Sequence, residues 1–174
     1  MTLSRPVQGL LLVALGAALL LAHASLYDFI CDDAYITFRY AKNLAEHGAP
    51  LYNLDERVEG YTNFLWMVLS AALLRVGATV PALVGILGAV SALVLQWGVW
   101  RVWTRVWPSA PLAALFPIVG VSASMAVACW TLGGLETTLY TALLLLGVEA
   151  VLALAARSSS AVAVRAGLNA SGSR

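Results

Sequence analysis

Two adjacent carboxylates and a nearby pair of cations are the side chains of this sequence best suited to chemistry. Asp32 and Asp33 come a few residues after a long apolar stretch, and Arg39 and Lys42 follow within a few helical turns. A carboxylate can act as a general base or bind a hard cation such as Mg²⁺, Mn²⁺ or Ca²⁺. Arginine binds phosphate through a bidentate fork, and lysine binds it as a point charge.

The composition excludes most soluble classes of protein. Of the 174 residues, 61% are hydrophobic and only 11% are charged, whereas soluble domains carry about 25% charged residues. The net charge is +1 and no run of basic residues occurs, so nucleic acid is not an expected partner. The spacing of Cys31 and Cys129 fits neither a disulfide framework nor a metal site. We therefore expect an all-α integral membrane protein.

Four stretches are long and apolar enough to cross a hydrocarbon core of about 30 Å. They span residues 7–26, 81–100, 111–130 and 138–156. The first also resembles a cleavable secretory signal. A fifth apolar stretch, 62–77, is shorter and contains an arginine, so we interpret it as a helix in the outer interface. The small, polar residues of the tail, 157–174, predict disorder.

The charges favour four crossings over five. Short cytoplasmic loops collect Lys and Arg, and four crossings place five of the arginines on the cytoplasmic side, at positions 5, 101, 105, 157 and 165. Loop 27–80, which contains seven of the nine acids, then lies on the extracytoplasmic side together with Glu136. With five crossings, Arg101 and Arg105 move outside and Glu136 moves inside. Glu149 lies inside a predicted span, where it either serves a function or extends to the cytoplasmic interface.

The residues after Asp32 predict an amphipathic helix on the membrane surface. Asp33 is a suitable N-cap and Gly48 a suitable end. At 100° per residue, one side of this helix is polar and the other apolar. A second polar segment, 52–66, adds acids and aromatic residues. Together with the start of the last span, these segments supply the candidates for a substrate cavity, which are Tyr35, Glu59, Tyr61, Asn63 and Glu136. Glu136 has an alternative role as a carboxylate at a helix start.

Three segments of the chain resemble a known family. They are "DDAYITFRYAKNLAEHG", "YNLDERVEGYTNFLWMVLSA" and "WTLGGLETTLYTALLLL". They resemble the N-terminal part of the GT-C glycosyltransferases, especially the arabinofuranosyltransferase-like proteins of the mycobacterial cell envelope and their uncharacterised bacterial relatives. The resemblance covers about residues 7–156 and implies a multi-pass protein of a bacterial cytoplasmic (inner) membrane.

The resemblance also implies a reaction. Such enzymes move a sugar from a polyprenyl-phosphate donor to a glycan acceptor outside the membrane, and an acid of the first extracytoplasmic loop is catalytic. Asp32 or Asp33 would fill that role here. Because a cap carboxylate is committed to backbone N–H groups, we expect Asp32 to be the general base. Arg39 and Lys42 would stabilise the leaving phosphate, unless a divalent metal held by the two acids does so.

The chain departs from this family in length. GT-C enzymes have more than four spans, so we expect an N-terminal fragment of such an enzyme, which could be inactive alone. The alternative is a small, non-catalytic multi-pass membrane protein, because small residues in the first span suit packing against other helices.

Overall fold

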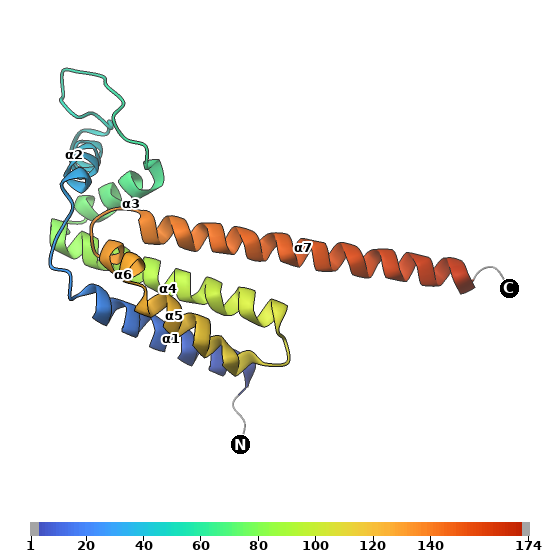
Figure 1. Cartoon of the computed structure of the whole chain (residues 1–174). Coiled ribbons are helices and arrows are strands. Elements are labelled where there is room, and N and C mark those ends of the chain that lie inside the picture. The colour runs from blue at the N-terminus through green and yellow to red at the C-terminus, as the bar shows by residue number, and fades with distance from the viewer. Residues whose placement is uncertain (1–3, 172–174) are drawn as a thin grey trace.

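The computed structural model describes residues 4–171, and these residues form helices with no β-strand. The expected all-α class is therefore confirmed. Figure 1 shows the elements in chain order, which are α1 (Arg5–Ala24), α2 (Asp32–His47), α3 (Phe64–Arg75), α4 (Val80–Val106), the 3₁₀ helix η1 (Pro111–Ala114), α5 (Leu115–Ala123), α6 (Met125–Thr131) and α7 (Thr137–Ser171).

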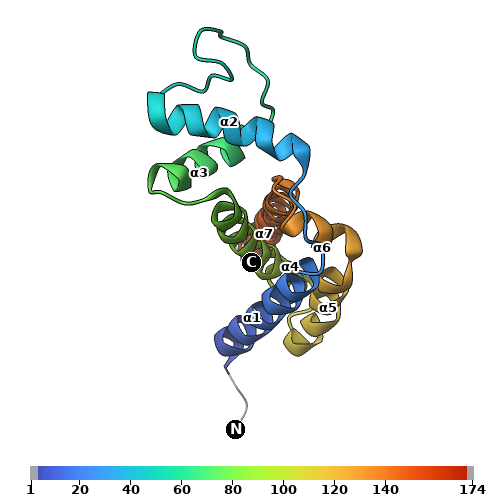
Figure 2. The same cartoon turned by 90° about the vertical axis from the view of Figure 1, so that its left-hand side faces the viewer.

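The helices form a bundle with a cap at one end. α1, α4, α7 and the α5–α6 pair lie side by side, and α2 and α3 lie across the end of the bundle where α4 and α7 begin (Figures 1 and 2). At the opposite end, the Arg5 guanidinium donates a hydrogen bond to the carbonyl of Pro108 at 2.8 Å. That bond places the start of α1 beside the residues that follow α4.

Within residues 4–171, three helical segments are long and apolar enough to cross a membrane: α1, α4 and Thr137–Ser159 of α7. α5 and α6 become a fourth candidate if the bent pair is counted as one span, since they meet at 67°. The break falls at Ser124, whose backbone is extended and whose hydroxyl accepts a hydrogen bond from the N–H of Val127. α3 has only 12 residues, which is short for a crossing.

Two helix ends differ from the sequence-based boundaries. α4 continues past residue 100 to Val106, because arginine is a good helix former and the first proline after the span is Pro108. α7 continues to Ser171, whereas composition predicted disorder over 157–174; residues 172–174 lie outside the described part. Adding a residue to an existing helix orders one residue for each hydrogen bond gained, and the ribbon of α7 continues past the end of the bundle (Figure 1).

Small residues and one polar network hold the spans together. A Cβ on Gly16 of α1 would lie 2.5 Å from Ile118 of α5 and 2.9 Å from Gln96 of α4. The Gln96 amide donates to the Ser122 hydroxyl at 2.9 Å, and that hydroxyl in turn donates to the Gly16 carbonyl at 3.0 Å. Close backbone approach and interhelical hydrogen bonds are the usual means of helix association in lipid.

Gly88 of α4 supports the most specific prediction about this packing. A Cβ there would lie 2.5 Å from the Thr131 carbonyl oxygen, a backbone atom, whereas a Cβ on Gly85 one turn earlier meets nothing within 4 Å. We expect Gly88→Ala to destabilise the fold by about 1–3 kcal/mol through overpacking. Gly85→Ala should leave stability unchanged or raise it by up to about 1 kcal/mol through helix propensity. Thermal unfolding of both variants in the same detergent measures the difference, and equal midpoints would contradict this packing.

Candidate functional site

The turn between α6 and α7 joins the three segments singled out by the sequence. The backbone N–H of Cys31, just before α2, donates to the Gly133 carbonyl at 2.9 Å. The indole N–H of Trp66 in α3 donates to the Gly134 carbonyl at 3.0 Å. Gly134 has φ +90°, and a Cβ on it would lie 2.9 Å from the Cβ of Ala34. The glycine pair therefore allows α2 and α3 to dock on the end of the bundle.

Asn63 and Glu136, two predicted cavity residues, meet beside this turn. The Asn63 amide donates to the Glu136 carboxylate at 2.8 Å and to the Thr37 hydroxyl of α2 at 3.1 Å. The Thr37 side chain is buried, and those of Asn63 and Glu136 are half-buried. The Glu136 carbonyl accepts the first hydrogen bond of α7, from Tyr140 at 2.8 Å. Glu136 thus starts α7 with its backbone and contacts the loop before α3 with its side chain.

The prediction that Asp33 caps α2 is wrong. α2 begins at Asp32, the cap position is Cys31, and the Cys31 side chain makes no capping hydrogen bond. Because its N–H is bonded to Gly133, Cys31 is fixed in an extended conformation and its carbonyl accepts from the N–H of Ala34. Both carboxylates are therefore exposed in the first turn, where the helix dipole favours them. The predicted end at Gly48 is confirmed by its left-handed φ of +73°.

The two acids lie on different sides of α2. Asp32 is seven residues before Arg39, or two helical turns, and so shares the face of Arg39 and Lys42. Asp33 is one turn before Thr37 and so lies on the side of α2 that Thr37 occupies. The rotation of 100° between neighbouring residues thus separates the two carboxylates.

Arg39 and Lys42 line a cavity of about 810 Å³ between α2 and the loop after it. Of the other predicted site residues, Tyr35 lines this cavity, whereas Glu59 and Tyr61 line a separate hollow of about 360 Å³ beside Gly48. Asn63 and Glu136 belong to the cluster with Thr37. The remaining polar residues of the larger cavity are Asn43, Glu46, Tyr52, Asn53 and Asp55.

The Arg39 side chain holds the loop that follows α2. Its guanidinium donates to the Tyr52 carbonyl and to the Asn53 side chain, both at 2.7 Å, and stacks over the Tyr52 ring at 4.4 Å. Lys42 is 63% exposed, and its ammonium lies 3.9 Å from the Glu46 carboxylate, an ion pair worth little at a surface. Lys42 is therefore the cation more available to a ligand.

Sequence reasoning missed the residues that position the site. Thr37 and Tyr40 are buried on α2; the Tyr40 hydroxyl donates to the Val58 carbonyl at 2.9 Å and so fixes the loop. A signal existed for Thr37, because it lies four residues after Asp33, on the same side of the predicted helix. No comparable signal marked Tyr40, whose partner is a backbone carbonyl 18 residues away.

Among the described residues, no group of three or more His, Cys, Asp or Glu side chains lies close enough to hold a metal ion. Asp32 and Asp33 supply two carboxylates at most, on different sides of a helix. The same helix thus carries exposed carboxylates and exposed cations.

No family model, no curated protein and no solved structure matches this chain.

Asn63 supports a prediction about how the cap is attached to the bundle. Asn63→Ala removes the amide that joins Thr37 of α2 to Glu136 and leaves two polar groups without their partner. We expect a loss of about 1–3 kcal/mol, seen as a lower thermal midpoint and faster hydrogen exchange in α2. Thr62→Ala changes an exposed neighbour and serves as the control. An Asn63→Ala protein as stable as the control would show that the cluster does not hold the cap.

Proposed function

We propose that the α2 end of the bundle binds a polyprenyl-phosphate sugar and transfers the sugar to a glycan acceptor, as the N-terminal part of a GT-C-type glycosyltransferase. One observation supports this most directly: α2 lies across the end of a helical bundle, with an exposed carboxylate, Asp32, on the same face as Arg39 and Lys42. A lipid-linked phosphate needs cations beside an apolar bundle, and the acceptor hydroxyl needs a base nearby.

The spacing along α2 suits one displacement reaction. Asp32 and Arg39 are about 10 Å apart along the helix axis. A base hydrogen-bonded to the acceptor hydroxyl, an attacking oxygen about 3–3.5 Å from the anomeric carbon, and a phosphate held by a cation make an array of similar length. Asp32 takes the hydroxyl proton as the new C–O bond forms. The bond to the donor phosphate breaks, its electron pair leaves with the phosphate, and the anomeric centre inverts.

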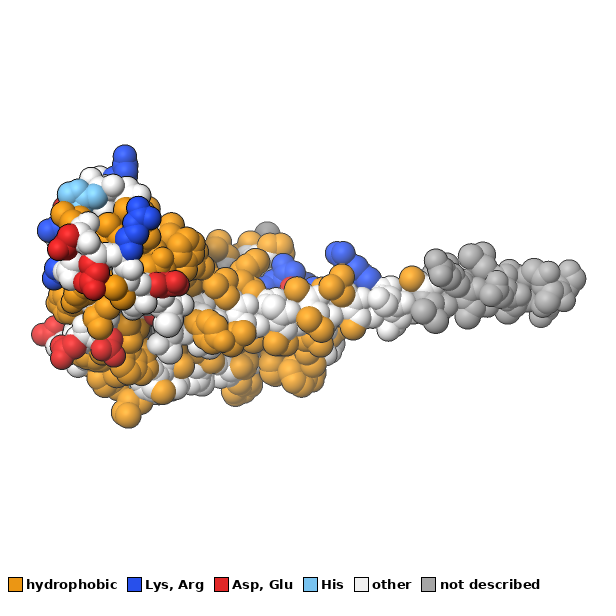
Figure 3. Space-filling view, turned by 90° about the horizontal axis from the view of Figure 1, so that it is seen from above, with side chains coloured by type: hydrophobic (Ala, Val, Ile, Leu, Met, Phe, Trp, Pro, Cys, Tyr) orange, Lys and Arg blue, Asp and Glu red, His pale blue; other side chains and the backbone are white. Residues whose placement is uncertain are grey.

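The distribution of charge supports an orientation for this site. Acidic side chains gather at the α2 end of the molecule (Figure 3). Arg5 lies at the other end, beside the residues that follow α4, and Arg101 and Arg105 lie in the last turns of α4. Since Lys and Arg favour cytoplasmic loops, we place the α2 end on the extracytoplasmic face of a bacterial inner membrane.

One observation favours the alternative, a non-catalytic membrane protein. Arg39, Asn63 and Glu136 all make internal hydrogen bonds that hold the cap together, so their polarity already has a structural use. Asp32 and Lys42 do not share this explanation, because both are exposed. The two predictions below therefore test these two residues.

Lys42→Gln should weaken binding of undecaprenyl phosphate by about tenfold or more, because one charge-assisted hydrogen bond is lost. Binding is measured on the purified chain in nanodiscs. Undecaprenol, the same lipid without its phosphate, is the comparison ligand. Arg57→Gln is the matched control, since Arg57 is an exposed cation of the same region that does not line the cavity. Equal affinities for the phosphate and the alcohol would contradict a phosphate site on α2.

Asp32→Asn should lower sugar transfer by about 10²–10⁴-fold, the usual contribution of a general base, and leave undecaprenyl phosphate binding intact. Asp33→Asn should retain most of the activity, because its side chain lies on another side of α2. Transfer is measured as radiolabelled sugar moved from a polyprenyl-phosphate donor to a glycan acceptor in membranes containing the chain. The reverse pattern would exchange the two roles; a wild-type chain that binds donor without transferring sugar would favour the non-catalytic alternative.

A further inference from the structure

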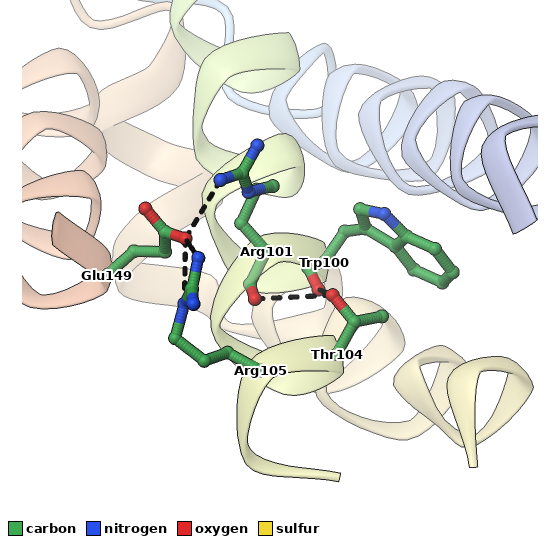
Figure 4. A network of polar contacts seen from close by, with 5 residues as sticks. All are labelled: Trp100, Arg101, Thr104, Arg105 and Glu149. Carbon is green, nitrogen blue, oxygen red and sulfur yellow. Dashed lines mark hydrogen bonds and ion pairs between the residues drawn. The ribbon is translucent and has the colours of Figure 1, made fainter. Parts of the chain in front are cut away.

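Three charged side chains meet in the bundle, far from α2. Glu149 of α7 is only 8% exposed, and its Oε1 accepts hydrogen bonds from Arg101 and Arg105 of α4 (Figure 4). The distances are 2.9 Å from Arg101 Nη2 and 2.9 Å from Arg105 Nε. Glu149 therefore turns toward α4 and does not extend along α7 to the interface. Sequence reasoning treated these three residues separately because the contact requires α4 and α7 to be adjacent.

This ion cluster, Arg101, Arg105 and Glu149, has one positive charge in excess. Within residues 4–171, Glu149 is the only carboxylate within ion-pair distance of the two arginines. Glu149 lies in a helical segment long and apolar enough to span a membrane, and the two arginines lie in the last turns of another. An uncompensated charge is costly in such surroundings. The cluster therefore favours an anion from the membrane as its remaining partner.

A groove between α1 and α4 leads to this cluster. It has a volume of about 550 Å³, and Arg101 is the one charged residue among those that line it. Its walls are apolar and aromatic, with Leu10 and Val13 on α1 and Leu93 and Trp97 on α4. The Arg101 guanidinium lies 5.5 Å from the centre of the Trp97 ring, and the Arg101 side chain is 41% exposed. An apolar groove with a cation at its end matches a molecule with a hydrocarbon chain and an anionic head.

We propose that this groove binds an anionic phospholipid, with an acyl chain between α1 and α4 and the phosphate accepting hydrogen bonds from Arg101. The structure gives Arg101 one hydrogen bond among the described residues, through Nη2, which leaves other N–H groups of the guanidinium for a phosphate. The excess charge selects an anionic head over a zwitterionic one, because a zwitterionic head brings its own cation. Clusters of arginine between membrane helices bind anionic lipid heads in this way.

The test compares the lipids that the purified chain retains. The whole chain is equilibrated in detergent with phosphatidylglycerol or phosphatidylcholine of identical acyl chains, and bound lipids are counted by native mass spectrometry. We expect wild type to retain phosphatidylglycerol about tenfold more than phosphatidylcholine. Arg101→Gln should abolish the preference, because it removes the phosphate contact and the excess charge together. Glu149→Gln should strengthen the preference, because it raises the excess charge of the cluster from one to two.

Arg157→Gln is the control, since it removes a positive charge from α7 outside the groove and should leave the preference unchanged. Equal retention of the two lipids by wild type, or an equal loss in Arg157→Gln, would overturn the proposal. A preference for undecaprenyl phosphate over phosphatidylglycerol would also overturn it and assign the groove to a carrier lipid. Circular dichroism checks that each variant is folded. If Arg101→Gln unfolds, the opposite effect of Glu149→Gln decides: a stronger preference supports the proposal, and an unchanged or weaker one overturns it.

Discussion

The cap of this protein depends on two glycines between α6 and α7. Their carbonyls accept hydrogen bonds from the backbone before α2 and from the indole of Trp66, so one short turn fixes both helices of the cap. Gly134 has a left-handed φ, which glycine adopts without strain. Any side chain at this position would also collide with Ala34 and Ile30. The backbone of the turn thus acts as the docking surface for two segments that are distant in sequence.

This docking fixes where the acids of the candidate site lie. Because the bond to Gly133 fixes Cys31, α2 starts two residues earlier than its sequence suggests, and both acids enter the first turn. The helical rotation then assigns Asp32 to the face of the two cations and Asp33 to the side of Thr37. Arg39 and Tyr40 hold the loop over α2 through the Tyr52 and Val58 carbonyls. Lys42 and Asp32 remain exposed, with their charges available to a ligand.

The membrane imposes a different constraint on the rest of the chain. Side chains inside a span have no water to bind, so polar groups there must find partners on other helices. The Gln96 amide N–H and the Ser122 hydroxyl meet in this way between α4 and α5, and Glu149 does so with two arginines of α4. The first pairing is neutral, whereas the second leaves one positive charge. That excess positive charge is what the phosphate of the proposed lipid would balance.

The sequence alone determined the class of the fold, the approximate positions of the spans and the end of α2 at Gly48. These features depend on local properties: hydrophobic length against bilayer thickness, amphipathic period and the conformational freedom of glycine. It also identified the polar segments that meet at one end of the bundle, because their composition differs so clearly from the spans.

Only the tertiary structure decided how those segments fit together. The start of α2, the commitment of Arg39 to its loop, and the contact between Asn63 and Glu136 each depend on a partner distant in the chain. The ion cluster has the same origin, since Glu149 and its arginines are 44 and 48 residues apart. Sequence patterns report the preferences of neighbouring residues, whereas these contacts arise from the packing of whole helices, which places distant side chains within hydrogen-bonding distance.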